Sequence, residues 1–314
     1  MLESVETPRA KARKPKMVSA MILAVIVSVF AISEMVLRVF VGLGDPPLLI
    51  PHDTIGYVNK PGHYRRFGND IRYNSCFIRS EPIAPKSANE LRVLVCGDSI
   101  VHGTARVDQT ELATAIAQRE LDDTLKRPVS VFNISACGWG PRNVLAYLDK
   151  YGTFGADLSI LVFNEGDMVE ASGGGGRVYP TVTPTLALQE AFQLAAQRLF
   201  GRSGGITTIQ RDSTVPSIDA LFGLFQGQGV EVTVFYHPSA AEAQNETQNR
   251  SYPLLARCAE GRAVNCVSLR DDFVRGLRRG EDPWRPDGLH LTVRGQAILA
   301  EALVREVLKS IKRR

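Results

Sequence analysis

Two short segments carry residues whose types and spacing suit nucleophilic chemistry. Gly97-Asp98-Ser99 places a serine on a turn that follows an apolar run, where its Oγ is exposed and its N–H is free to face an oxyanion. Asp287-Gly-Leu-His290 spaces a carboxylate three residues before an imidazole. The carboxylate can accept from Nδ1, which leaves Nε2 to take the serine proton. A Gly-Asp-Ser tripeptide alone is more typical of a turn or helix cap, so its position decides its meaning.

Apolar runs that alternate with helix-length segments predict the elements that position these residues. Five strands are expected, and helices are expected between them and after the last strand. The strands are 91–95, 129–134, 158–163, 230–236 and 264–269, and the helices are 110–125, 143–151, 218–225, 252–259 and 294–311. This order predicts a doubly wound, three-layer α/β/α sandwich around a parallel sheet. Ligands bind beyond the carboxyl ends of such strands, where Ser99 and His290 fall.

At these segments the chain resembles the SGNH, or GDSL-type, hydrolases from about Leu91 to its end. The resemblance implies a flavodoxin-like fold with a five-stranded sheet, Ser99 as nucleophile, His290 as base and Asp287 as its orienting acid. Asn133-Ile-Ser-Ala-Cys-Gly138 resembles the family's second block, so Gly138 is expected to donate its N–H to the oxyanion hole. His102 lies next to the expected site and is interpreted as structural.

The third block departs from the family pattern. Relatives carry an Asn directly before the Asp, whereas this chain reads Phe163-Asn164-Glu165-Gly166-Asp167. Two alternatives remain open: Asn164 reaches the oxyanion hole from two residues earlier, or the third donor is missing. Loss of one such donor costs roughly 100- to 1000-fold in kcat, so activity would be low without being absent.

The N-terminal segment predicts a membrane anchor. Five cations precede the apolar run that begins at Met17, and the pair Glu34 and Arg38 is spaced for contact on one helix face. Residues 17–43 are long enough to span a bilayer. By the positive-inside rule the tail 1–16 is cytoplasmic and the domain is exported, which predicts a single-pass membrane protein. Cleavage as a signal peptide near Ser33 is the alternative.

Two further regions differ from the core pattern. Residues 44–90 contain six prolines and predict a lead-in that packs on the domain 91–314. Residues 169–216 predict an insertion on the substrate side, with a glycine run at 173–176 and an amphipathic stretch at 186–200. The anchor pair Glu34 and Arg38 and three lead-in motifs resemble membrane-anchored bacterial SGNH proteins, which implies a place in the bacterial inner membrane with the domain in the periplasm. The lead-in motifs are Ile55-Gly-Tyr57, Lys60-Pro-Gly62 and Asn74-Ser-Cys-Phe77-Ile-Arg79. That resemblance implies a role in O-acetylation or deacetylation of envelope polysaccharides.

Composition narrows the function classes. The chain is 44% hydrophobic and 22% charged, which excludes a disordered protein, and beyond residue 44 it carries 31 cations and 30 acids. This balance makes a nucleic-acid partner unlikely on electrostatic grounds. Cys258 and Cys266 are close enough in sequence to pair in an oxidising compartment. No metal or organic cofactor is expected.

The prediction is therefore a membrane-anchored serine ester hydrolase that forms an acyl-Ser99 intermediate. Its substrate is expected to be an acylated small molecule or glycan, and the sequence does not indicate protein partners. Two alternatives remain: an O-acetyltransferase that uses the same triad, and an inactive glycan-binding scaffold.

Overall fold

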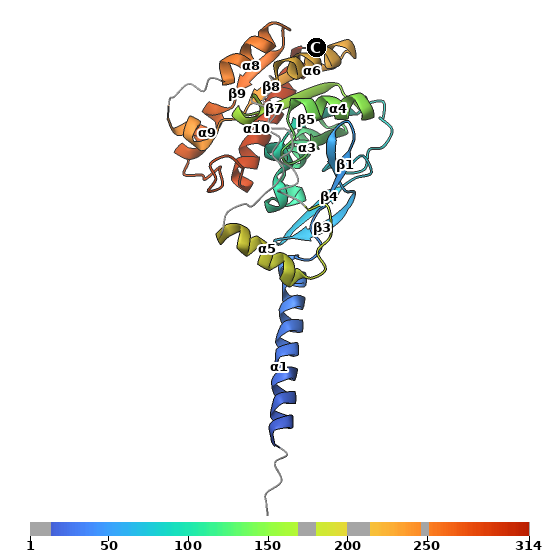
Figure 1. Ribbon diagram of the computed structural model, residues 1–314. Coiled ribbons are helices and arrows are strands. Elements are labelled where there is room, and N and C mark those ends of the chain that lie inside the picture. The colour runs from blue at the N-terminus through green and yellow to red at the C-terminus, as the bar shows by residue number, and fades with distance from the viewer. Residues whose placement is uncertain (1–13, 169–179, 200–213, 246–250, 314) are drawn as a thin grey trace, which may run out of the picture.

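A computed structural model describes residues 14–168, 180–199, 214–245 and 251–313, and Figure 1 shows a globular head on one long helix. Helix α1 (Lys14–Val36) continues into the π-helical turn η1 (Leu37–Val41) and ends at Gly42, where φ is 74°. The apolar stretch Met17–Val41 is not buried against the rest of the protein. The predicted N-terminal apolar helix is confirmed, although it ends two residues before the expected 43. The cations Arg9, Lys11 and Arg13 lie outside the described residues.

The head is built on one parallel sheet of five strands, as predicted. The strands are β5 (Leu91–Gly97), β6 (Val129–Ser135), β7 (Leu158–Phe163), β8 (Glu231–Tyr236) and β9 (Asn265–Ser268). They pair in the order β6-β5-β7-β8-β9. The chain order therefore reverses between β5 and β7, which is the position where sheets of this kind hold their ligands.

Helices cover both faces of the sheet and complete the predicted three-layer sandwich. Val93 and Val95 of β5 pack toward α3, α9 and α10, whereas Leu94 and Cys96 pack toward α4, α6 and α8. This alternation follows from the strand period of two, because both faces are buried. The helices are α3 (Ala113–Leu125), α4 (Pro141–Tyr151), α6 (Val215–Gly227), α8 (Ser251–Glu260), α9 (Arg270–Arg278) and α10 (Val293–Arg313). Helix α9 and the short α7 (Ala240–Gln244) were not predicted from the sequence.

The lead-in has more regular structure than its prolines suggested. It forms two antiparallel hairpins, β1 (Leu49–His52) with β2 (Gly56–Asn59) and β3 (Gly62–Arg66) with β4 (Asn69–Tyr73). Their buried side chains cluster with Ala105 and Cys137 of the head. The lead-in is therefore part of the head's packing, which the sequence analysis expected, but its four strands were missed.

The insertion contributes α5 (Ala187–Leu199), which matches the predicted amphipathic stretch and lies where α1 meets the head (Figure 1). The glycine run 173–176 lies outside the described residues. Cys258 and Cys266 are separate free thiols, so the suggested disulfide is not formed.

Candidate active site

Ser99 lies at the carboxyl end of β5, as the first residue of the short helix α2 (Ser99–His102). Asp98 caps this helix by accepting a hydrogen bond from Ile100 N at 2.8 Å. A Cβ on Gly97 would lie 2.8 Å from the carbonyl oxygen of Val162, so only glycine fits where the strand turns into the helix. Because Ser99 is the first helical residue, its N–H has no partner within the helix. The close packing of β5 against β7 thus places Ser99 at the carboxyl ends of the central strands.

The structure brings Ser99, His290 and Asp287 together although 191 residues separate Ser99 from His290. His290 Nε2 lies 2.9 Å from Ser99 Oγ, and His290 Nδ1 lies 2.9 Å from Asp287 Oδ2. The loop that carries the acid and the imidazole precedes α10. Gly288, with φ of 71°, makes its sharp bend. The two sequence segments singled out above therefore form one hydrogen-bonded chain.

The hydrogen bonds around Asp287 fix the proton positions. Burial acts to raise the pKa of Asp287, but bonds from His290 N, Leu289 N and the imidazole outweigh it and lower that pKa below its ordinary value. An ionised carboxylate only accepts, so His290 Nδ1 is the protonated nitrogen. With Nδ1 as the only protonated ring nitrogen, Nε2 accepts a hydrogen bond and Ser99 Oγ donates to it. This is the arrangement in which the ring can remove the serine proton.

Asn164 lies at the end of β7, across the switch point from Ser99. Its Nδ2 donates to Asp98 Oδ2 at 2.9 Å, and its Oδ1 accepts from Gly166 N at 2.7 Å. Burial raises the pKa of Asp98 above its ordinary value, although the hydrogen bonds from Ile100 and Asn164 and the nearby His290 partly oppose this effect. Asn164 is therefore held by the residue that directly precedes Ser99. The third block has an amide beside the nucleophile turn despite its irregular sequence.

Gly138 is an exposed residue in the turn that follows β6, with φ of 81°. The lead-in holds this turn: Tyr57 OH donates to Cys137 O at 2.9 Å, and Asn59 Nδ2 donates to Ser135 O at 3.2 Å. Residue type and spacing along the chain did not indicate a role near the site for Tyr57 or Asn59. Because these contacts link residues about 80 apart, only the folded chain reveals them.

Arg79 was another residue whose role the sequence analysis missed. Its buried guanidinium donates to the carbonyl oxygens of His102, Thr104 and Val107 at 2.5 to 2.6 Å. Gly103 and Thr104 both have positive φ, so Arg79 holds a strained turn directly after the nucleophile helix. Its place in the motif that ends the lead-in was the available signal.

His102 has a structural position. Its Nε2 lies 2.9 Å from Tyr73 OH, and its Nδ1 lies 3.3 Å from Cys137 Sγ. Burial, aided by the charge of Arg79, holds the pKa of His102 well below its ordinary value. The ring is therefore neutral and ties the lead-in to the turn beside Gly138.

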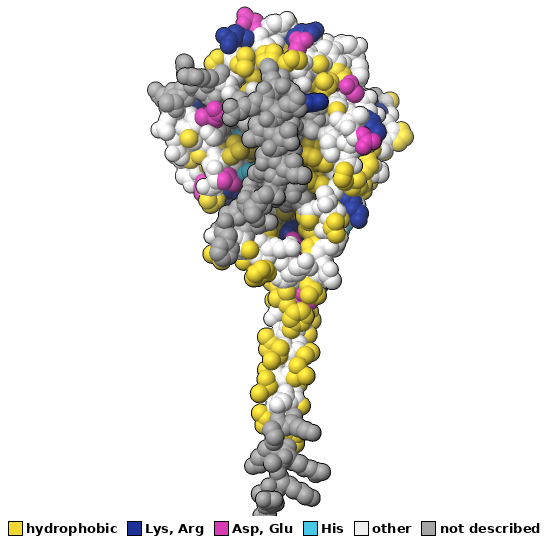
Figure 2. Space-filling view, in the orientation of Figure 1, with side chains coloured by type: hydrophobic (Ala, Val, Ile, Leu, Met, Phe, Trp, Pro, Cys, Tyr) yellow, Lys and Arg dark blue, Asp and Glu magenta, His cyan; other side chains and the backbone are white. Residues whose placement is uncertain are grey.

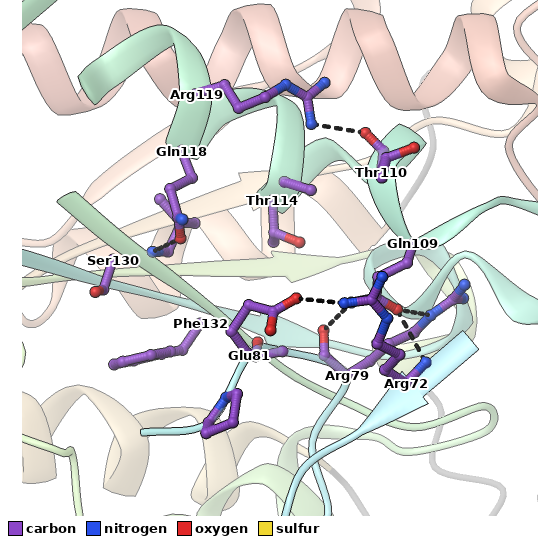
Figure 3. Close-up of a pocket in the computed structure, with 14 residues that line it drawn as sticks. Arg72, Arg79, Glu81, Gln109, Thr110, Thr114, Gln118, Arg119, Ser130 and Phe132 are labelled. Atoms are coloured by element: carbon purple, nitrogen blue, oxygen red, sulfur yellow. Dashed lines mark hydrogen bonds and ion pairs between the residues drawn. The ribbon is translucent and has the colours of Figure 1, made fainter. Parts of the chain in front are cut away.

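A pocket of about 290 Å³ lies between α3, β6 and the end of the lead-in, and the triad does not line it (Figure 3). Its polar groups bond one another: Arg72 pairs with Glu81, and Arg79 donates to Gln109 (Figure 3). The side chains that line the pocket therefore belong to the hydrogen-bonded group around Arg79, and the pocket is separate from the candidate site.

No protein-family model matches the chain, and no curated protein matches it. Among solved structures it is similar to a lipase/acylhydrolase from Enterococcus faecalis, at 15% identity and a TM-score of 0.45, over 69% of this chain and 95% of the other. An acetylxylan esterase from Geobacillus stearothermophilus is similar at 17% identity and a TM-score of 0.45, over 69% of this chain and 94% of the other. A two-domain esterase active on acetylated mannans is similar at 13% identity and a TM-score of 0.46, over 71% of this chain and 50% of the other.

Proposed function

We propose that the protein is a serine ester hydrolase that acts through an acyl-Ser99 intermediate. The observation that carries this proposal is the hydrogen-bonded chain from Asp287 through His290 to Ser99, with both links at 2.9 Å. Serine hydroxyls are weak nucleophiles unless an adjacent base removes the proton, and this geometry supplies the base and its orienting acid.

The proposed reaction has two halves. Ser99 Oγ attacks the ester carbonyl while His290 Nε2 takes the hydroxyl proton, and the tetrahedral intermediate then expels the alcohol, which receives that proton from His290. Water attacks the acyl-Ser99 ester in the same way, with His290 again as base, and releases the carboxylic acid and free Ser99. Asp287 stays ionised throughout and stabilises the imidazolium.

Three donors are proposed for the developing oxyanion: the N–H groups of Ser99 and Gly138 and the amide of Asn164. Ser99 N–H is at the start of helix α2, and Gly138 is an exposed residue in the turn that follows the neighbouring strand β6. The Asn164 amide nitrogen has two hydrogens, and Asp98 accepts one of them, which leaves the other for the oxyanion. Such preorganised donors supply a large part of the rate enhancement in acyl transfer.

Acetyl esters of envelope glycans are the proposed substrates, on the strength of the lead-in and anchor motifs that resemble membrane-anchored SGNH proteins. Water is the proposed acceptor. The side chains of His290 and Asp287 are 31% and 49% exposed, so solvent reaches the base. This openness favours hydrolysis over transfer to a second hydroxyl, which requires a dry site.

The proposed location is the bacterial inner membrane, with α1 as the single span, the N-terminus in the cytoplasm and the head in the periplasm. The 25-residue stretch Met17–Val41 is predominantly apolar and is not buried in the head, which suits a lipid environment. The preceding cations support this orientation.

Labelling of the full chain with a fluorophosphonate probe tests the proposed nucleophile. The wild-type protein should be labelled and should hydrolyse a short p-nitrophenyl ester. Ser99→Ala should lose both properties, His290→Ala should lose turnover, and Asp287→Asn should lower kcat by roughly 10³- to 10⁴-fold. Ser87→Ala removes an exposed serine and should be labelled like the wild type. Unchanged turnover in Ser99→Ala would refute the enzyme proposal.

A further inference from the structure

The start of helix α5 is hydrogen-bonded to a side chain of the anchor helix α1, near the end of α1 that joins the head. Glu34 Oε1 accepts from Ala187 N and Oε2 accepts from Leu188 N, both at 2.9 Å. Arg38, which pairs with Glu34, donates to Thr185 O at 3.0 Å. Glu34 thus supplies two of the acceptors that the first turn of α5 lacks, from a residue 153 positions earlier in the chain.

A second set of contacts fixes the other side of α5. Glu190 is buried, accepts from Gly44 N at 2.6 Å and pairs with Arg66 of β3. Arg66 also donates to Gly42 O at 3.2 Å. The end of the anchor, the β3–β4 hairpin and α5 are therefore linked to one another by hydrogen bonds. These contacts fix the position of α5 along the axis of the anchor helix.

The opposite side of α5 exposes large apolar side chains. Phe192 and Leu199 are 75% and 77% exposed, and seven residues place them on one helix face two turns apart. Ala195, also exposed, lies between them on that face. Figure 2 shows apolar side chains continuing from the anchor helix onto the base of the head, where Figure 1 places α5. Full burial of one such side chain is worth about 1.5 to 3 kcal/mol, so this face favours an apolar environment.

The level of α5 along the anchor matches the edge of a bilayer. Glu34 follows Met17 by 17 residues, which is roughly 26 Å of helix against a hydrocarbon core of about 30 Å. Phe40 of η1, six residues further along the helix, is 74% exposed. The apolar face of α5 is thus continuous with the exposed apolar surface of the span.

We propose that α5 lies in the headgroup region of the membrane leaflet nearest the head, with Phe192 and Leu199 at the boundary of the acyl chains. The partner is lipid, because the surface continues that of the anchor helix and because α5 is bound to the helix end that meets the interface. This inference rests on the membrane anchoring proposed above. It makes the insertion a second membrane contact, which holds the head at a fixed height and tilt over the bilayer.

Tryptophan quenching by brominated lipids tests this placement in the full chain reconstituted into vesicles. Phe192→Trp should show blue-shifted emission and lose intensity most strongly when the bromines lie near the headgroups. Phe30→Trp, within the span, should be quenched most strongly by bromines deep in the acyl chains. Lys150→Trp, on α4 at the end of the head remote from α1 in Figure 1, should not be quenched. The native Trp139 and Trp284 are buried in the head and provide the background signal to subtract.

The outcomes separate this inference from the anchoring on which it depends. Quenching at position 30 without quenching at position 192 would mean that water, a second copy of the chain or another protein covers α5, and it would overturn the inference while leaving the anchor intact. Absence of quenching at position 30 would overturn both. Quenching at 192 and 30 but not at 150 is the expected result.

Discussion

At the scale of single residues, Asn164 decides how complete the oxyanion hole is. It is buried and held by Asp98, the residue before Ser99. We expect Asn164→Ala to lower kcat by roughly 100-fold with little change in KM, because the lost hydrogen bond forms fully only with the oxyanion. Ester hydrolysis at varied substrate concentration measures this split.

Asn74→Ala is the matched control for this substitution. Asn74 is also buried in a turn, where it accepts from Cys76 N and donates to Glu81 O. Its replacement should lower the Tm and leave kcat within a few-fold. A loss of stability without a loss of kcat in Asn164→Ala would assign Asn164 the same structural role and leave two oxyanion donors.

At the scale of elements, strand β5, which leads to Ser99, is held at its start by the partly buried carboxylate of Glu90. Glu90 accepts hydrogen bonds from Arg92, Ser130 and Ser87 N, and these lower its pKa to about 2 against the opposing effect of burial. Because its pKa is lower in the folded state than in the unfolded chain, Glu90 stabilises the fold above about pH 4.5. That contribution is lost as the pH falls from about 4.5 toward 2.

We therefore expect Glu90→Gln to destabilise the protein by at most about 3 kcal/mol at pH 7 and by progressively less in acid. Thermal unfolding of the detergent-solubilised chain at several pH values measures the difference. Glu81→Gln removes an exposed partner of Arg72 and should change the Tm little at any pH. A pH-independent difference for Glu90→Gln would show that lost packing, and not ionisation, accounts for the effect.

At the scale of the whole molecule, one helix separates a basic tail from the head. A reporter that is active only outside the cytoplasm should work when fused after Arg314, and the protein should stay with membranes after alkaline washing. Replacing the five cations before Met17 with glutamine should reduce reporter activity, because they direct the orientation. Recovery of the head in the soluble periplasmic fraction would instead indicate cleavage near Ser33.

Much of the fold could be predicted because its signals are local. Strands β5 to β8 are apolar runs buried on both faces, and all five predicted strand ranges agree with the structure to within two residues at either end. The lead-in strands were missed because their prolines and alternating polar residues resemble a linker. They become strands by pairing with one another and by packing on Ala105 and Cys137 of the head.

The sequence by itself determined which residues are candidates for chemistry and the order along the chain of the strands that carry them. It also determined the presence of an apolar helix long enough to span a bilayer. These features depend on residue type, on short spacings and on the length of apolar runs. The tertiary structure alone decided that Asn164 bonds Asp98, that Arg79 holds the turn after Ser99 and that Glu34 caps α5. Each of these contacts joins residues that are 23 to 153 positions apart, and spacing along a chain does not specify such contacts until packing brings the elements together.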